Sequence, residues 1–442
     1  MRTLATAQPD FEAAFEKLLS RATVAPELSG AVGEIIGRVR SQGDAALLEY
    51  TARFDRLELN AAELRVTADE LAEAEAQTPP ALREALAVAA RRIETFHKAQ
   101  LPQDIAYTDD EGITCGMRWG ALDAVGLYVP GGKAAYPSSV LMNAVPAKVA
   151  GVERIAMVVP APDGVLNPYV LTAANVAGIT EIYRVGGAQA VAALAYGTAT
   201  IQRVDRIVGP GNAYVAEAKR QVFGQVGIDS IAGPSEVLII ADEGCDPEQL
   251  AYDLLAQAEH DEDAQSILVT NSATLAEAVE KSVAQALETL PRKEIAGTSW
   301  RRHGAIILVR NWDEAVEISN RVAPEHLQLM LADPEPVFAK VRHAGAVFLG
   351  RNTPEAMGDY IIGPNHVLPT SGTARFASGL SVYDFMKRTT YAHVPAQGLG
   401  RLGAMAVTLA QAEGLDAHAQ SVAVRLEPDD MRSNRPSDRS HV

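Results

Sequence analysis

Apolar and polar residues recur at helical spacing through the first hundred residues of the chain. Between Asp10 and Ala22 the apolar positions form one stripe with charged residues elsewhere, and they are Phe11, Ala14, Phe15, Leu18 and Leu19. Such a stripe is typical of an amphipathic helix that docks on another surface. Helical patterns continue to about Ile105, and the acidic run ADELAEAEAQ indicates a solvated helix face.

From about Gly126 the pattern changes to short apolar runs that end at glycine or proline. Examples are GLYVPGG, RIAMVVPAP, EIYRVGG, DRIVGPGN, VLIIAD, SILVT, AIILVR and AVFLG. Runs of this length that alternate with helical segments such as AQAVAALAYG predict parallel strands joined by crossover helices. We therefore expect an α/β fold, whose serial strand and helix units could hide two similar halves. The final segment, EPDDMRSNRPSDRSHV, is polar without periodicity and is expected to be disordered.

Length and charge narrow the class of protein. The chain has 442 residues, of which 48% are hydrophobic and 21% charged. We therefore expect a compact soluble protein of about two to four domains. The formal net charge of −17 speaks against nucleic acid or an anionic membrane as the main partner, because both would be repelled. Small-molecule ligands are expected instead.

The sequence also bears on location. Its start lacks the basic stretch and apolar run of a secretory signal, and no segment offers about 18 uninterrupted apolar residues for a membrane helix. The two cysteines, Cys115 and Cys245, have no CxxC partner, so neither a thiolate zinc cluster nor a disulfide framework is expected. These features predict a cytoplasmic protein.

Three glycine turns each follow a strand pattern and precede a helical one. The first, YVPGGKAAYPSS with Gly132 and Lys133, is no ATP-type loop, because its upstream glycine is one place off GxxxxGK and Ala134 replaces the hydroxyl residue. It still suits a phosphate or pyrophosphate at a helix start. The turns in VGGAQAVAA and VGPGNAYVAEAKR bring Gln189 and Asn212 to the same edge, which favours a dinucleotide crevice. Binding there would be atypical, because GxGxxG with an acidic residue about 20 positions on is missing.

Polar residues in otherwise apolar or glycine-rich company mark a candidate metal site. Gln257 and His260 stand three apart in LLAQAEHDED, on a helical pattern, so both side chains can point to one spot. Others of this kind are Glu325, His326, Asp359, His366, Glu413 and His418. Such oxygen and nitrogen donors suit a borderline metal such as zinc. Each could equally be a hydrogen-bonded core residue, and spacing alone does not show that they converge.

Several long segments resemble the signatures of the histidinol dehydrogenase family. They are GLYVPGGKAAYPSSVLMNAVPAKVAGV, VGGAQAVAALAYGT, VGPGNAYVAEAKR, IAGPSEVLIIAD, LLAQAEHD, APEHLQLM, MGDYIIGPNHVLPTSGTARFASGLSVYDF and EGLDAHAQS. The resemblance runs from about residue 10 to residue 424 and so covers most of the chain.

The resemblance implies a reaction and its cofactors. The enzyme would oxidise L-histidinol to L-histidine through L-histidinaldehyde, the last steps of histidine biosynthesis, with two NAD molecules in succession and one zinc ion per site. The implied zinc ligands are Gln257, His260, Asp359 and His418. It also implies a homodimer with shared sites, in which the segment bearing Glu413 and His418 reaches into the neighbouring subunit.

The same resemblance assigns binding residues. Tyr128, Gln189 and Asn212 would contact NAD. The substrate would be contacted by Ser235, His326, His366 and Glu413, and by the four zinc ligands Gln257, His260, Asp359 and His418.

The implied architecture is two unequal α/β domains with an incomplete Rossmann-like topology, and short terminal segments that wrap the partner subunit. The expected parts are an N-terminal helical arm 1–24, a larger domain 25–126 with 235–378, a smaller nucleotide domain 127–234, a dimer-swapped C-terminal segment 379–426 and a disordered tail 427–442.

The chemistry requires a base near neutral pKa within reach of the carbinol hydroxyl proton, and His326 is our candidate. The aldehyde must stay bound for the second oxidation, and Glu325 can activate the water that adds to it. Adjacent residues of a regular strand point to opposite faces, so this pairing predicts a turn or loop at Pro324 to His326. A covalent route through Cys115 or Cys245 is disfavoured, because acidic surroundings would raise the pKa of both thiols.

Three other functions remain open from the residues alone. A paralogue could oxidise another small alcohol or diol, although the retained Ser235 and His366 argue against changed substrate contacts. A zinc hydrolase would need only water activation by Glu325, and the glycine turns with Gln189 and Asn212 would then have no purpose. A catalytically silent binding or assembly protein would have no use for the intact set of polar residues.

Overall fold

The computed structural model of the chain describes residues 1–20, 26–131, 136–231 and 233–427. Gly132, Lys133 and Ala134 of the first glycine turn, residues 21–24 of the expected arm and the tail from 428 onward lie outside the described residues. The chain divides into two units, the first comprising Met1–Leu101 and Ala121–Phe385 and the second Pro102–Gly120 and Met386–Val442. Among the described residues, every helix is too short or too polar to span a lipid bilayer.

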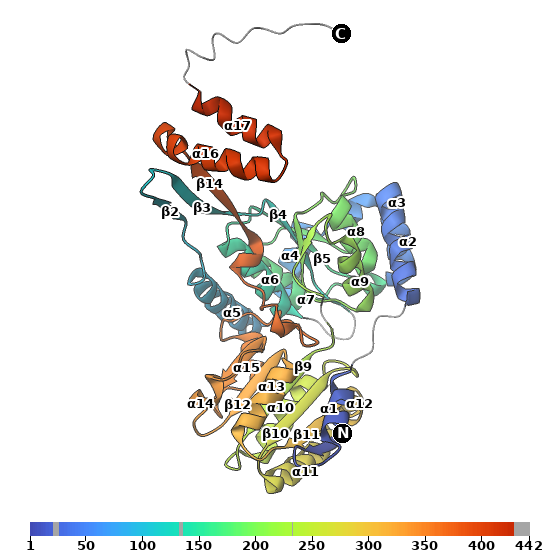
Figure 1. Ribbon diagram of the computed structural model, residues 1–442. Helices are drawn as coiled ribbons and strands as arrows, with labels where there is room; N and C mark the ends of the chain where they lie inside the picture. Colours follow the sequence, from blue (N-terminus) through green and yellow to red (C-terminus); the bar gives the residue numbers. More distant parts are fainter. Residues whose placement is uncertain (21–25, 132–135, 232, 428–442) are drawn as a thin grey trace. The chain divides into compact units, whose positions relative to one another are not determined.

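One half of the first unit is built on a six-stranded sheet whose pairings are all parallel (Figure 1). In spatial order its strands are β1 (Arg2–Ala5), β11 (Ala305–Leu308), β10 (Gln265–Thr270), β9 (Glu236–Ala241), β12 (His326–Met330) and β13 (Ala346–Leu349). One face packs on α1 (Phe11–Leu19), α13 (Trp312–Val322) and α14 (Glu335–Phe338), and the other on α10 (Pro247–Ala258), α11 (Ala273–Thr289) and α12 (Lys293–His303). Because helices cover both faces, the central strands are buried along their full length and read as continuous apolar runs.

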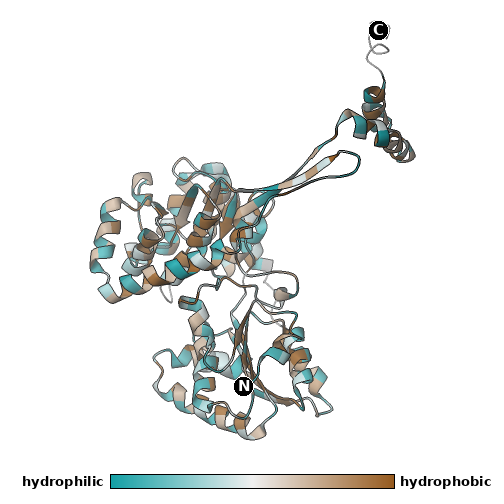
Figure 2. Cartoon of the chain, turned by 90° about the vertical axis from the view of Figure 1, so that its left-hand side faces the viewer, coloured by the Kyte–Doolittle hydropathy of each residue, from teal (hydrophilic) through white to brown (hydrophobic). Residues whose placement is uncertain are grey.

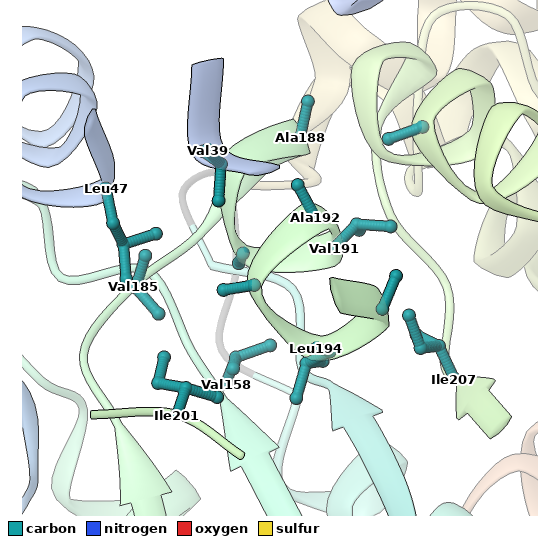
Figure 3. Close-up of a cluster of buried hydrophobic side chains, with 14 of the residues drawn as sticks. Val39, Leu47, Val158, Val185, Ala188, Val191, Ala192, Leu194, Ile201 and Ile207 are labelled. Atoms are coloured by element: carbon teal, nitrogen blue, oxygen red, sulfur yellow. The ribbon is translucent and has the colours of Figure 1, made fainter. Parts of the chain in front are cut away.

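The other half is a five-stranded parallel sheet. In spatial order its strands are β6 (Glu181–Tyr183), β5 (Arg154–Val158), β4 (Ala124–Tyr128), β7 (Arg206–Val208) and β8 (Gly227–Ile228). The helices that connect these strands are α6 (Pro137–Val149), α7 (Pro168–Val176), α8 (Gly187–Tyr196) and α9 (Ala213–Val222). Helices α2 (Pro26–Gln42) and α3 (Asp44–Asp55) pack over α8, and Figure 3 shows Val39 and Leu47 from these helices in the same core as Val185 and Val191. Helices α4 (Ala68–Gln77) and α5 (Pro80–Lys98) pack on α7 and α6.

The two sheets share one topology. Numbered along the chain, β4 to β8 lie in the order 3-2-1-4-5, and β9 to β13 lie in the same order, with β1 added at the edge. This order lacks one strand of the six-stranded dinucleotide-binding arrangement 3-2-1-4-5-6. The prediction of an α/β fold with Rossmann-like sheets is therefore confirmed, and the two similar halves suspected from the sequence are present as two sheets.

The boundaries of the parts differ from those expected. The N-terminal segment is no separate arm as far as it is described, because β1 pairs with β11 and Phe11, Phe15 and Leu18 lie in the core of the six-stranded sheet. Residues 26–98, expected in the larger domain, pack instead on the five-stranded sheet, since α2 and α3 bury their apolar faces against α8. Residues 102–120, expected in the larger domain, belong instead to the same unit as the C-terminal segment.

The second unit is a three-stranded sheet with a helical hairpin. The sheet has the order β14 (Met386–His393), β3 (Thr114–Ala121) and β2 (Ile105–Thr108), and the hairpin consists of α16 (Ala396–Ala412) and α17 (Asp416–Leu426). The ring of Tyr391 lies against the backbone of Gly116, where any side chain would collide with it. Hydrophobic residues on the two helices are drawn in brown near the C-terminus in Figure 2, and many of them are exposed.

The remaining short helices of the chain are α15 (Glu355–Tyr360) and the 3-10 turns η1 (Ala61–Leu64), η2 (Pro162–Gly164), η3 (Thr373–Arg375) and η4 (Val382–Phe385).

Candidate functional site

Two acids and a histidine meet at the amino ends of the neighbouring strands β9 and β12. Nδ1 of His326 lies 3.0 Å from the carbonyl oxygen of Glu236. The backbone N–H of Glu236 donates to Oε2 of Glu325 at 2.8 Å, and the N–H of Glu325 donates to Oε2 of Glu236 at 3.4 Å. Since a carbonyl oxygen can only accept, Nδ1 carries a proton, and Nε2 is the nitrogen at which the ring gains or loses its second proton. All three side chains are buried.

The free nitrogen of this histidine faces two further acids. Nε2 of His326 lies 3.8 Å from Oε1 of Glu355 and 3.7 Å from Oδ1 of Asp359, and it has no hydrogen-bond partner among the described residues. Glu355 and Asp359 are four apart on α15, so they share one helix face. Ligand atoms of His326, Glu355 and Asp359 all lie within 4.8 Å of one another, which is close enough to hold one metal ion.

The irregular backbone before β12 allows the adjacent residues Glu325 and His326 to point into the same site. Ala323 adopts a left-handed conformation at φ 48°, and Glu325 lies at a bend just before the strand begins at His326. As a result Oε2 of Glu325 lies only 3.7 Å from Nδ1 of His326. The predicted irregularity is confirmed at Pro324 and Glu325, whereas His326 is already the first residue of strand β12.

Glu236, Glu325, His326, Glu355 and Asp359 together form the buried cluster of the site. Burial and the charges of neighbouring members shift the pKa values of the last four. Burial raises the pKa of Glu325 to about 8 and that of Glu355 to about 7. For Asp359 burial also acts upward, but contact with His326 and the charges of the other histidines bring the pKa down to about 2. Burial acts to lower the pKa of His326, yet the surrounding carboxylates raise it well above its ordinary value. Groups able to exchange protons near neutrality are therefore concentrated here.

Helix α10 brings a second pair of residues to the cluster, because it packs against α15. Gln257 lies in its last turn, fully buried, and neither Oε1 nor Nε2 has a partner within the described ranges. His260 follows the helix end, and its charge interacts with those of Asp359, His326 and His366. Burial lowers the pKa of His260, which keeps the ring neutral and able to coordinate a metal.

These atoms fit a divalent cation. Both side-chain atoms of Gln257 are buried without partners in the described part of the chain, and such atoms are rare unless a ligand satisfies them. The donors are oxygen and nitrogen only, as zinc accepts when cysteine is missing from its site.

His366 links the cluster to the half with the five-stranded sheet. Its Nδ1 donates to the carbonyl oxygen of Asp359 at 2.9 Å, and its Nε2 lies 3.4 Å from Oγ of Ser139 in the first turn of α6. Asn365 next to it donates to the carbonyl oxygen of Met142 on the same helix. Ser235, another expected substrate contact in this unit, is half-buried directly before Glu236.

The expected nucleotide residues lie at the carboxyl ends of the five-stranded sheet. Tyr128 ends β4, and its hydroxyl accepts a hydrogen bond from the N–H of Gly187 at 3.0 Å. Gln189 follows in the first turn of α8, buried, and its Oε1 has no partner in the part of the chain that is described. Asn212 caps α9, where its Oδ1 accepts from the N–H groups of Tyr214 and Val215.

The turn before Asn212 is held tightly against β4. A Cβ on Gly209 would lie 2.1 Å from the carbonyl oxygen of Tyr128, so only glycine fits. The buried Asp229 accepts from the N–H of Gly209 at 2.8 Å, and the Lys219 ammonium, paired with Asp229, donates to the Gly209 carbonyl at 3.0 Å. Because β4 and β7 are the strands between which the order reverses, this turn stands where dinucleotides bind in such folds.

Two expected site residues belong to the second unit. Glu413 lies at the end of α16 and His418 in the first turn of α17, and both are exposed. The first unit thus gathers Gln257, His260, Glu325, His326 and Asp359, while Glu413 and His418 are carried by a separate unit.

The sequence reasoning missed two members of the cluster. Glu236 begins a fully buried strand. A charged residue in the otherwise apolar run SEVLIIAD is unusual, and it is the signal that could have identified Glu236. Glu355 stands four residues before Asp359, and that helical spacing was the signal that could have found it.

Neither cysteine belongs to the buried cluster around His326. Sγ of Cys245 donates to the carbonyl oxygen of Met330, at the opposite end of β9 and β12 from Glu236 and His326. Its pKa is raised, as predicted, but the main cause is burial rather than the neighbouring acids. Cys115 lies on β3 in the second unit.

The chain is similar over nearly its whole length to a family model, to curated proteins and to a solved structure. The family model described as histidinol dehydrogenase matches residues 19–426. The chain is 62% identical to the histidinol dehydrogenase of Gluconobacter oxydans, over 97% of this chain and 100% of that protein. It is 60% identical to the one of Rhodospirillum rubrum, over 96% and 98%. The crystal structure of histidinol dehydrogenase from Elizabethkingia anophelis superposes with a TM-score of 0.91 at 38% identity, over 96% and 98% of the two chains.

Proposed function

Because the chain belongs to the histidinol dehydrogenase family, we propose that it oxidises L-histidinol to L-histidine through L-histidinaldehyde in two successive NAD-dependent steps. The observation that carries the mechanism is the buried His326, whose Nδ1 is fixed on the Glu236 carbonyl and whose Nε2 is left free and faces Glu355 and Asp359. Near-complete coverage of relatives at 56–62% identity supports this substrate over another small alcohol or diol.

In the first oxidation His326 accepts the hydroxyl proton of the substrate at Nε2. The Glu236 carbonyl holds one proton on Nδ1, so Nε2 is the nitrogen through which the ring exchanges a proton with the substrate. The imidazolium that results is stabilised by the carboxylates of Glu355 and Asp359, which lie within 4 Å of Nε2. NAD bound at the five-stranded sheet supplies the hydride acceptor.

In the second oxidation a water must add to the aldehyde before the next hydride can leave. Glu325 is placed to take a proton from that water, because it lies beside His326 and its pKa of about 8 allows proton exchange near neutrality. His326 then acts again as the base at the hydrate.

Gln257, His260 and Asp359 of the first unit, with His418, would hold one zinc ion. Zinc bound there supplies an anchor for the imidazole and amino nitrogens of the substrate and keeps the aldehyde in place. The unpartnered buried amide of Gln257 and the neutral His260 support this assignment. Ser235, His326, His366 and Glu413 would contact the substrate.

Tyr128, Gln189 and Asn212 would contact NAD. Two observations support this assignment. The three residues follow the carboxyl ends of β4, β6 and β7, and Oε1 of Gln189 is buried without a partner among the described residues. Since family members use the acceptor twice, we propose that two NAD molecules bind this one site in succession.

We further propose a cytoplasmic homodimer with shared sites, in which Glu413 and His418 of each chain complete the site of its partner. Both residues are exposed in their own chain. Large apolar side chains on α16 are exposed as well, among them Met405 and Leu409 at 64% and 67%, which is typical of a surface that another subunit covers.

The test of this function is the stoichiometry of reduced nicotinamide. With L-histidinol as the limiting substrate, we expect two NADH per substrate, and with L-histidinaldehyde one. Chelation of zinc should abolish both signals, and added zinc should restore them. One NADH from L-histidinol would mean that aldehyde is released, and none would favour a hydrolase or a silent protein.

A further inference from the structure

A buried acid with an unpartnered oxygen lies among the glycine turns of the five-stranded sheet. Asp55 is the last residue of α3, and its side chain is only 8% exposed. The backbone N–H of Ala161 donates to its carboxylate, but Oδ2 has no partner within the described residues. Arg56, next in the chain, donates its hydrogen bonds to Asp163, although its charge also acts on Asp55. A carboxylate buried in this way is unfavourable unless something else satisfies it.

The place of Asp55 in the fold indicates what that partner is. Ala161 lies three residues beyond the end of β5, which is the second strand of the 3-2-1-4-5 order. In dinucleotide-binding sheets of this kind, an acid near the carboxyl end of the second strand holds the hydroxyls of the adenosine ribose. The segment after β5 offers only Asp163, which is exposed and already bound to Arg56.

The glycine turns converge on the same spot. A Cβ on Gly186 would lie 2.4 Å from Cβ of Pro160, and one on Gly131 would lie 2.8 Å from its Cγ, so the turns after β4 and β6 flank the residue before Ala161. Gly187 of the third strand's turn binds the Tyr128 hydroxyl, and the charge of Asp55 reaches the Tyr128 side chain. Asp55 therefore stands beside the residues that the proposed function assigns to NAD.

We propose that Asp55 is the ribose-binding acid of this site, supplied by α3 because the acid after β5, Asp163, is exposed and paired with Arg56. This inference rests on the proposed function, and it assigns Oδ2 as the acceptor for the 2′-hydroxyl of the adenosine ribose. It also explains selectivity, because a 2′-phosphate would be repelled by the carboxylate, so NAD is bound in preference to NADP.

The test is equilibrium binding to the full-length enzyme by calorimetry, without turnover. Asp55→Asn should weaken NAD binding about tenfold, because a hydrogen bond to a charged group is lost. It should leave binding of nicotinamide mononucleotide unchanged, since that compound lacks the adenosine half. Asp163→Asn is the matched control, an exposed acid of the same turn, and should bind NAD as the wild type does.

Wild-type enzyme gives a second readout that does not depend on the folding of a variant. It should bind NAD about tenfold more tightly than an NAD analogue that lacks the adenosine 2′-hydroxyl. Equal binding of the two by wild type, or equal loss of NAD and nicotinamide mononucleotide in Asp55→Asn, would overturn the assignment of Asp55 alone. Wild-type enzyme that binds no NAD would overturn the proposed function together with it.

Discussion

The carbonyl oxygen of Glu236 fixes the tautomer of His326 through a 3.0 Å hydrogen bond to Nδ1. The two residues begin neighbouring parallel strands, with His326 in register with Val237. A backbone carbonyl cannot change its protonation state, so this contact orients the ring in the same way throughout a catalytic cycle. The variable part of the site is the free Nε2, which faces Glu355 and Asp359.

His326→Asn should lower the rate of both oxidations by about 100-fold to 10,000-fold, because the base that both steps share is lost. Steady-state rates with L-histidinol and with L-histidinaldehyde measure the two effects separately. His303→Asn, a change at a half-buried histidine outside the cluster, serves as the control. A His326→Asn enzyme that keeps full rate in either step would show that another group is the base.

Glu325→Gln should impair the aldehyde step more than the alcohol step. The glutamine keeps the shape of the side chain and can still accept from the Glu236 N–H, but it cannot take a proton from water. The expected sign is accumulation of aldehyde when L-histidinol is the substrate. Equal slowing of both steps would indicate that Glu325 only supports His326.

Cys245→Ser and Cys115→Ser should retain both oxidations. Cys245 is buried at the far end of β9 from Glu236, and burial raises the pKa of its thiol, which makes it a poor nucleophile. The ratio of NADH to L-histidinol consumed is the measurement. Loss of the second NADH in either variant would establish a thiol intermediate and refute the water route.

Glu217→Gln should reduce the acid sensitivity of the fold. The Arg220 guanidinium and the Gln221 amide hold the pKa of Glu217 at about 2, below its unfolded value of 4.5. A lowered folded-state pKa contributes stability that is fully present above pH 4.5 and is lost as the pH falls toward 2.

In Glu217→Gln the midpoint of urea unfolding should therefore fall less steeply over this pH range than in wild type. Glu94→Gln, an exposed acid paired with Lys98, is the comparison. Parallel pH curves for wild type and Glu217→Gln would contradict the assignment.

Much of the fold could be predicted because its signal is local. Strands such as VLIIA and SILVT are buried on both faces and so appear as short apolar runs. The glycine turns were visible because Gly187 and Gly209 have positive φ, and Gly209 also lies against the backbone of Tyr128. Glu325 and His326 were found as one unit because they are adjacent in the chain.

What escaped prediction depends on contacts between distant segments. The pairing of β1 with β11 joins residues about 300 positions apart, and nothing in RTLA specifies that partner. The packing of α2 and α3 on α8 uses apolar faces that would fit either sheet. Asp55 escaped for the same reason, because its role comes from a contact with Ala161, 106 positions further along the chain.

The central claim is that Gln257, His260 and Asp359 converge on one divalent cation beside His326. The most direct measurement is zinc bound per chain, followed by mass spectrometry over a zinc titration, on wild type, His260→Asn, Asp359→Asn and the control His303→Asn. We predict one zinc per chain in wild type and in the control, and at least a tenfold loss of zinc affinity in His260→Asn, as expected when one ligand is removed. Zinc retained in full by His260→Asn and by Asp359→Asn, or no zinc in wild type, would contradict the account.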